Sequence, residues 1–306
     1  MRRFARSLLP ALLFLIPLVC AAQASRVSSV EKVADGVWMA QTAAGSNAGW
    51  FLVGDEVVAV DAGSDAETGK ALLDKIRETA GKPVHYLVVT HAHGDHGGGV
   101  GPFAAAGAEV ISHENAAPGL VQLVAPASKA KAGLIAFSER LALFGGPRRV
   151  AVYFLGAAHT SSDILVLLPD DKVLFSGDVV LGKRAPFMQS PDVDPKGWEN
   201  ILARLSKLDV EKVVPGHGTA GPKQLIADTY GYVKKVNELA ALLLLEKTDE
   251  SLIEARLRRP DTGMQDASIS PELIANIRAT MRAQSAKPAP TPSPKPQKKA
   301  PAGKKG

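Results

Sequence analysis

One ten-residue segment restricts the fold of this chain more than any other feature. Residues 90–99 read Thr-His-Ala-His-Gly-Asp-His-Gly-Gly-Gly. His91, His93, Asp95 and His96 offer imidazole and carboxylate groups, which are typical ligands of zinc and related metals. The alternate histidines can face one ion while the adjacent acid and imidazole face another. We therefore expect a fold that brings further ligands to this segment.

Three more candidate ligands lie later in the chain, and each follows a short apolar run typical of a β-strand. These are His159, Asp178 and His217. If the strands run in the same direction, the residues after them meet at one edge of a sheet. Five of the seven histidines then fall in the predicted site. The runs that precede the candidate ligands are residues 84–90, 150–155, 172–176 and 211–215.

The order of apolar patterns predicts sheets that are covered by helices. Dense β-branched residues near the start favour a meander of strands. A capping box of Ser64 and Glu67 predicts the start of the first helix, and Asp194 followed by Pro195 predicts the start of a second. The expected strands are 27–33, 36–43, 49–53 and 57–61; the expected later helices are 222–246, 252–259 and 271–284.

The two ends have unusual compositions. Residues 1–24 carry arginines, then an apolar run of about 12 residues, then small residues, which is the order of a secretory signal with Ser25 as the mature start. Acylation of Cys20 is the weaker interpretation, because Pro17, Leu18 and Val19 are not the small residues that such processing prefers. Residues 285–306 are rich in Lys, Pro and Ala, which predicts a disordered tail.

The charge of the body argues against a nucleic-acid partner. Without the two ends, 27 Lys and Arg stand against 31 Asp and Glu, so the body is slightly acidic although the whole chain is basic. The basic tail is either a solvated linker or a weak contact with anionic polymers of the cell envelope.

Cys20 is the chain's one cysteine, so a mature chain has no thiolate to bind metal or attack a substrate.

The histidine segment resembles the signature of the metallo-β-lactamase superfamily. The resemblance extends in order to Gly156–Thr160, Phe175–Asp178 and Val214–Gly218, and covers roughly residues 27 to 220. It implies an α/β fold, a four-layer αββα sandwich, as a core domain at residues 25–220. The helices expected at residues 221–284 form an additional C-terminal extension.

The resemblance also implies a role for each ligand. His91, His93 and His159 would hold a first zinc ion, and Asp95, His96 and His217 a second. Asp178 would bridge both ions together with a hydroxide that attacks the substrate. Asp95 and Asp178 are the candidate catalytic carboxylates. Asp61 either supports the site from outside the ligand shell or simply ends a strand.

The resemblance implies a zinc-dependent hydrolase of an ester, thioester or lactone-type bond, and the signal-like residues 1–24 predict that it is exported, periplasmic or secreted. The carboxylate at Asp178 favours the glyoxalase II-like or periplasmic hydrolase branch, because lactamases of the commonest zinc class have cysteine there. A metallo-β-lactamase of the cysteine-free branch stays open. The same residues would also suit a mononuclear iron persulfide dioxygenase or a non-catalytic zinc-binding envelope protein, and iron or manganese could replace zinc.

The substrate is predicted to be a small molecule. Lys183 and Arg184 follow Asp178 on a loop that we expect beside the metals, where they could pair with an anionic group. Both could equally be solvated loop charges. His85 is expected to be a surface residue, and His113 to begin a helix or line the cleft.

Overall fold

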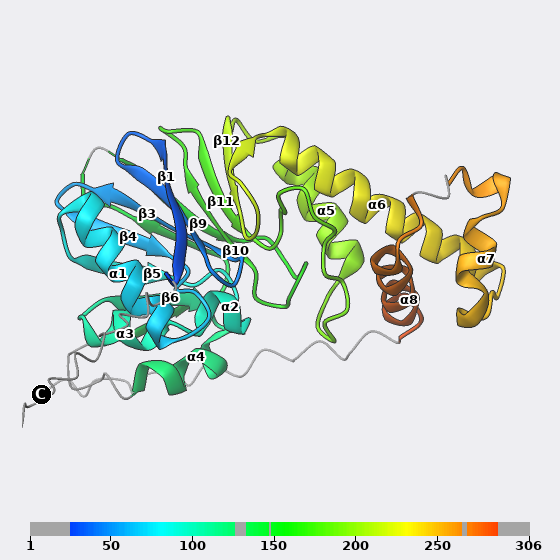
Figure 1. Cartoon of the computed structure of the whole chain (residues 1–306), viewed down its shortest axis with the longest axis horizontal. Coiled ribbons are helices and arrows are strands. Elements are labelled where there is room, and N and C mark those ends of the chain that lie inside the picture. Colours follow the sequence, from blue (N-terminus) through cyan, green and yellow to red (C-terminus); the bar gives the residue numbers. More distant parts are fainter. Residues whose placement is uncertain (1–24, 126–132, 147, 265–267, 287–306) are drawn as a thin grey trace, which may run out of the picture.

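A computed structural model describes residues 25–125, 133–146, 148–264 and 268–286. Its four layers are helices, sheet, sheet and helices (Figure 1). The αββα prediction is therefore confirmed. The predicted signal at residues 1–24 lies outside the described residues, and so does the predicted tail from residue 287 onward. Within the described ranges, no helix has the length and apolar character needed to cross a membrane.

The first sheet has seven strands in the order of the chain. Its first four strands form the predicted antiparallel meander, and its last three continue in parallel. The strands are β1 (Val27–Ala34), β2 (Val37–Thr42), β3 (Asn47–Val53), β4 (Glu56–Val60), β5 (Val84–Val88), β6 (Glu109–His113) and β7 (Leu134–Phe137).

The second sheet has six strands in the spatial order β13-β12-β11-β10-β9-β8. Only β11 and β12 pair in parallel. Because β9 and β11 both run antiparallel to β10, β9, β11 and β12 all point the same way. The strands are β8 (Arg140–Leu143), β9 (Val150–Phe154), β10 (Ile164–Leu168), β11 (Val173–Gly177), β12 (Lys212–Pro215) and β13 (Gly221–Pro222).

Aliphatic and aromatic side chains from both sheets fill the space between them. Phe51 of β3 packs against Phe175 of β11, with ring centroids 5.8 Å apart. Gly49 makes room for this contact, since a Cβ there would lie 2.2 Å from the Phe175 ring. A side chain at this position would push the sheets apart, so close packing depends on the glycine.

Helices bury the outer faces of both sheets. The first sheet is covered by α1 (Ala66–Ala80), α3 (Val100–Ala105) and α4 (Ala117–Val124), and the short α2 (Gly94–Gly97) lies in the histidine segment. The second sheet is covered by α5 (Pro195–Leu205) and α6 (Gln224–Leu245). Beyond them, α7 (Ile253–Leu257) and α8 (Pro271–Ser285) lie beside the later part of α6, at the end of the molecule away from α1 (Figure 1).

The helix starts agree only partly with the sequence analysis. Asp194 caps α5 as predicted, accepting hydrogen bonds from the backbone N–H groups of Lys196 and Gly197. The capping box at Ser64 is wrong, because Asp65 is the N-cap and accepts from the N–H of Thr68. The helix expected at residues 252–259 is shorter, with a 3₁₀ turn (Glu250–Leu252) before α7.

Candidate metal centre

The candidate ligands converge because their strands end at the same edge of the sandwich. His91 follows β5, His159 follows β9, Asp178 comes directly after β11, and His217 follows β12. The two sheets also touch there, through an isolated bridge between Ser46 and His217. The predicted meeting of strand ends is therefore observed.

All seven predicted ligand residues contribute to three overlapping groups whose ligand atoms lie within 4.8 Å of one another. Nδ1 of His93 lies 3.0 Å from Nε2 of His159. Nε2 of His217 lies 3.1 Å from Oδ2 of Asp95 and 3.5 Å from Oδ2 of Asp178. The three groups are His91, His93 and His159; His91, His96 and Asp178; and Asp95, His96 and His217.

Three buried polar atoms in this cluster lack a hydrogen-bond partner: Nε2 of His91, Nε2 of His96 and Oδ1 of Asp178. Nε2 of His96 lies 3.3 Å from Oδ1 of Asp178 without making a hydrogen bond. A buried polar atom without a partner is costly. Cation binding would satisfy all three, so these residues fit a metal ion by their own chemistry.

Four of the imidazoles are oriented by acceptors outside the cluster. Nδ1 of His96 donates to Oδ2 of Asp61 at 2.8 Å, and Nδ1 of His91 to Oγ1 of Thr90 at 3.1 Å. Thr90 in turn donates its N–H and hydroxyl to Asp61. The remaining two imidazoles donate to backbone carbonyls, His159 to Phe187 at 3.1 Å and His217 to Gly45 at 2.9 Å. Each contact turns Nε2 toward the cluster, as in known metal-binding histidines.

Asp61 occupies the position that the resemblance implied for a supporting carboxylate. It is buried after β4 with a φ of 61°, a left-handed conformation that Asp adopts more readily than most residues other than glycine. Its carboxylate accepts three hydrogen bonds from Thr90 and His96. It therefore does more than end a strand, because it orients His96 directly and His91 through Thr90.

The residues of the cluster differ in their pKa values and therefore in their protonation. Burial lowers the pKa of His91 well below its usual range and that of His159 to about 4, so both are neutral imidazoles. Burial also lowers the pKa of His217, but the carboxylates of Asp178 and Asp95 outweigh it and raise the value to about 9. For Asp178, burial raises the pKa, yet the imidazoles of His217 and His96 bring it well below its usual range.

The glycines of the histidine segment matter for space more than for backbone freedom. Gly98 and Gly99 have ordinary negative φ angles. A Cβ on Gly98 would lie 2.1 Å from the carbonyl oxygen of Ser64, and one on Gly99 would lie 2.0 Å from that of Ala62. These glycines let the segment pack closely against the loop before α1.

The cluster opens into a pocket of about 390 Å³. Arg184 lines this pocket, whereas Lys183 is exposed and is not among its lining residues. Leu181 and Phe187 also line it, and sequence reasoning missed both. They lie on a loop without regular secondary structure, and only the position after Asp178 could have pointed to them.

The two other histidines lie outside the pocket lining. His85 of β5 is exposed as expected, with Nδ1 3.8 Å from Oε1 of Glu56. His113 neither begins a helix nor lines the cleft. It is the buried last residue of β6, where it contacts the carbonyl of Ser138 at 3.1 Å and stacks on Phe154.

A family model described as the metallo-beta-lactamase superfamily matches residues 42–217, more than half of the chain. The chain belongs to this superfamily. Membership identifies a metal-dependent hydrolase in general terms, and the cluster of His and Asp is its candidate metal centre. The match to the superfamily ends at His217, so α6, α7 and α8 lie outside the matched region.

Curated superfamily relatives are similar over the core. The metallo-beta-lactamase type 2 of Bacillus sp. (strain 170) is 29% identical over 183 residues, 58% of this chain and 68% of that protein. The protein of the same name from Elizabethkingia meningoseptica is 28% identical over 177 residues, 56% of this chain and 68% of the relative.

Solved structures of the superfamily share the fold. A metallo-beta-lactamase from Pontibacter korlensis matches with a TM-score of 0.57 and 28% identity, covering 67% of this chain and 98% of its own. One from Erythrobacter litoralis matches with a TM-score of 0.54 and 21% identity, covering 70% and 98%. The second likeness concerns the fold alone.

Proposed function

We propose that this chain is an exported zinc-dependent hydrolase that cleaves an ester, thioester or lactone-type bond in a small molecule. The observation that carries this proposal is the convergence of seven imidazole and carboxylate side chains, five of which line one pocket, with three buried polar atoms left without partners. The signal-like residues 1–24 support export, and the slightly acidic body supports a partner other than nucleic acid.

The ligand roles follow the two outer groups of the cluster. His91, His93 and His159 would hold one zinc ion; Asp95, His96 and His217 would hold the second, with Asp178 between them. When bound, two such ions lower the pKa of a shared water toward neutrality and polarise a substrate carbonyl. Iron or manganese could occupy the same ligands, so the metal belongs to the proposal.

Two carboxylates serve the reaction in different ways. The side chain of Asp95 is 36% exposed and lines the pocket, so its carboxylate can accept a proton from the attacking water and return it to the leaving group. The side chain of Asp178 is only 9% exposed and lies close to His96, His159 and His217. Its role is to hold the two halves of the ligand set together as a fixed negative charge.

A panel of purified substrates tests the proposal. Esters, thioesters, lactones and β-lactams are assayed with and without a chelator, before and after zinc is restored. The proposal predicts chelator-sensitive turnover of a substrate in the first three classes. Zinc binding without any turnover would instead favour a non-catalytic zinc-binding envelope protein, and iron-dependent oxidation of a persulfide would favour a dioxygenase.

Hydrolysis of β-lactams is the second candidate. It is favoured by the names of the relatives, which are metallo-beta-lactamases at 27–29% identity. The carboxylate at Asp178 and the absence of any cysteine after Cys20 argue for the first candidate. In the panel, turnover of β-lactams alone would favour the second candidate function over the first.

The pocket is suited to a substrate that carries a negative charge. Arg184 lines the pocket and Lys183 does not, although they are neighbours on the same exposed loop. We expect Arg184→Ala to raise KM for an anionic substrate by about 3- to 10-fold through loss of a charged hydrogen bond. Lys183→Ala is the matched control and should leave KM near the wild-type value. Equal effects of the two substitutions would contradict an anion contact at Arg184.

A further inference from the structure

The C-terminal helices contact the loop that forms one wall of the pocket. This loop, residues 179–194 between β11 and α5, carries Leu181, Arg184 and Phe187 into the pocket lining. Each of three helices fastens it at a different point. Nε1 of Trp198 in α5 donates to the carbonyl of Val179 at 2.9 Å. Thr229 of α6 accepts from the N–H of Leu181 at 3.3 Å, and the third contact comes from Asn276 of α8.

Asn276 holds the loop on both sides of Phe187. Its Oδ1 accepts from the N–H of Met188 at 3.1 Å, and its Nδ2 donates to the carbonyl of Pro186 at 2.6 Å. Nδ2 also donates to the hydroxyl of Tyr232 in α6 at 3.0 Å. Asn276 as a whole residue is 1% exposed, so these hydrogen bonds form away from water, where the loss of one partner is costly.

The peptide between these two bonds orients a ligand of the candidate metal centre. The carbonyl of Phe187 lies 3.1 Å from Nδ1 of His159. Because a carbonyl can only accept, Nδ1 of His159 carries the proton and Nε2 carries the lone pair. Nε2 then faces the cluster, 3.4 Å from Oδ2 of Asp178. A fixed position of this carbonyl thus fixes both the tautomer and the direction of the ring.

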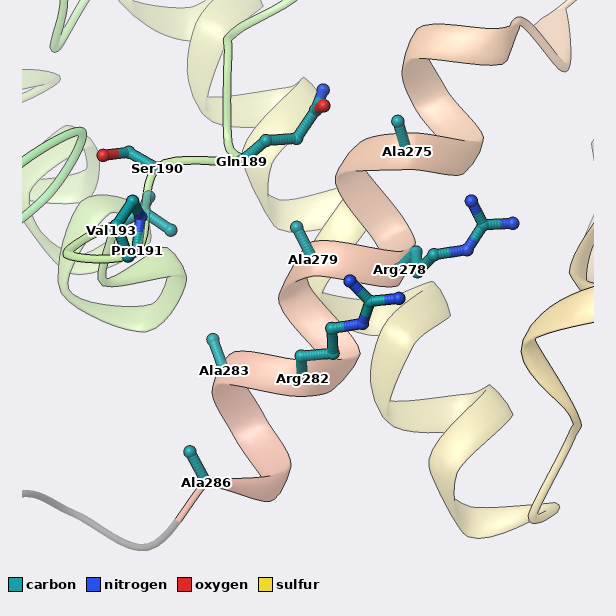
Figure 2. Close-up of a pocket in the computed structure, with 10 residues that line it drawn as sticks. All are labelled: Gln189, Ser190, Pro191, Val193, Ala275, Arg278, Ala279, Arg282, Ala283 and Ala286. Carbon is teal, nitrogen blue, oxygen red and sulfur yellow. The ribbon is translucent and has the colours of Figure 1, made fainter.

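Apolar packing does not fill the space between residues 189–193 of the loop and α8. A pocket of about 580 Å³ separates the loop from α8, and Ala275, Ala279 and Ala283 of the helix line it. Figure 2 shows these alanines on α8 and the loop residues Gln189 and Ser190 across the open space. The alanines provide little contact with this part of the loop. Met188 is buried in the same apolar cluster as Leu273 and Ile277 of α8, and the hydrogen bonds of Asn276 fix the backbone on both sides of Phe187.

We propose that Asn276 is a positioning residue of the metal centre. It fixes the backbone from Pro186 to Met188 so that the Phe187 carbonyl holds His159 with Nε2 toward the ligand cluster. Helix α8 therefore helps to position a ligand of the site, although it lies outside the region that the superfamily model matches. The proposal rests on the proposed function only where a metal bound by His159 is concerned.

The test compares Asn276→Ala with two controls in the same helical layer. Ile277→Ala removes a fully buried side chain from α8 and leaves the loop hydrogen bonds in place. Tyr232→Phe removes a partner of Asn276 that lies outside the loop and leaves the bonds to Pro186 and Met188, and the weaker one from Gln189 at 3.4 Å, intact. Long-range ¹H–¹⁵N NMR of the metal-free proteins at one fixed pH reports the tautomer of His159, and competition with a chelator reports zinc affinity.

We expect wild type, Ile277→Ala and Tyr232→Phe to keep the Nδ1–H tautomer of His159, and Asn276→Ala to lose it or show a mixture. Zinc affinity should fall by about 10- to 100-fold in Asn276→Ala, the usual effect of losing support behind a ligand, and by much less in the controls. If Asn276→Ala matches Ile277→Ala in both measurements at equal folded fraction, the proposal is overturned.

A smaller substitution keeps the test decisive if Asn276→Ala does not fold. Asn276→Asp retains the acceptor for the N–H of Met188, and both measurements are made at a pH above the pKa of the new carboxyl group, which burial raises; the ionised side chain cannot donate to the Pro186 carbonyl, so both measurements should change in the same direction. An unchanged His159 tautomer in this variant would also overturn the proposal. The NMR measurement needs neither metal nor substrate. A wild-type protein that binds no zinc would therefore refute the proposed function, while the role of Asn276 is still decided.

Discussion

The imidazoles of the ligand cluster differ in the ease with which they accept a cation. His91 and His159 are neutral because burial lowers their pKa values, so their lone pairs are available at once. The pKa of His217 is raised to about 9 by Asp178 and Asp95, against the effect of burial. A metal must displace that proton, so binding near neutral pH should release protons to solvent.

A buried carboxyl group near the site provides a separate test of pH dependence. Asp163 accepts hydrogen bonds from the N–H and hydroxyl of Thr160, and its burial raises its pKa to about 7. Between its unfolded value of 3.8 and about 7, the folded chain holds a proton that the unfolded chain has lost. Stability therefore falls as pH rises through this window.

We expect Asp163→Asn to remove this part of the pH dependence. Unfolding by urea at pH 4, 5.5 and 7 should show that the variant gains on wild type as pH rises, by up to a few kcal/mol at pH 7. Thr160 and the loop around it stay in place, because an amide oxygen still accepts from the N–H of Thr160. A constant stability difference across the three pH values would contradict a raised pKa in the folded protein.

At the scale of elements, the site depends on how closely two loops approach each other. Gly216 follows β12, and a Cβ there would lie 1.9 Å from Oδ1 of Asp178 after β11. Gly94 lies in the histidine segment with open space around its Cβ position. Gly216 therefore tolerates no side chain, whereas Gly94 has room for one.

This difference predicts opposite results for two similar substitutions. Gly216→Ala should displace the Asp178 carboxylate and lower zinc affinity by roughly 10- to 100-fold. Gly94→Ala should leave zinc affinity unchanged. Competition with a chelator measures both, and circular dichroism shows whether each variant is folded. Equal zinc affinities for the two variants would mean that Asp178 does not depend on the space at Gly216.

Local signals predicted the elements that carry the ligands, because strands and their ends are visible in the alternation of residue types. The runs before His91, His159, Asp178 and His217 became β5, β9, β11 and β12. The cap at Asp65 was missed by one residue because Ser64 also fits the capping pattern. The role of Asn276 could not be predicted, because it depends on contacts between segments about 90 residues apart, and the contact of Phe187 with His159 has no local signal beyond the loop's position after Asp178.

At the scale of the whole molecule, the helical layer over the second sheet belongs to its hydrophobic core. Leu273, Ile277 and Met281 of α8 are buried in the same cluster as residues of α5 and α6. The division into a core at residues 25–220 and an extension at residues 221–284 stays a prediction. Contacts in the cluster indicate that the extension supports the sandwich as well as the pocket loop.

Two truncations distinguish the contribution of α8 to stability from that of the tail. Ending the chain before Pro271 would remove these three apolar side chains, each worth about 1.5–3 kcal/mol when buried, and would expose the apolar residues of α6 that pack against them. The loss is comparable with the stability of an ordinary domain, so we expect aggregation or a large drop in Tm. Ending the chain after Ala286 removes only the Lys-rich residues 287–306 and should leave Tm unchanged. Equal Tm values for both truncations would contradict a structural role for α8.

The most direct test of the account is the metal content of the purified chain. Mass spectrometry after removal of metal and reconstitution with zinc gives the number of ions per chain. The ligand set predicts two zinc ions in the wild type and fewer in His217→Ala, which removes one ligand of the second group. A wild-type chain that retains no metal, or one iron ion and no zinc, would contradict the proposed two-zinc centre.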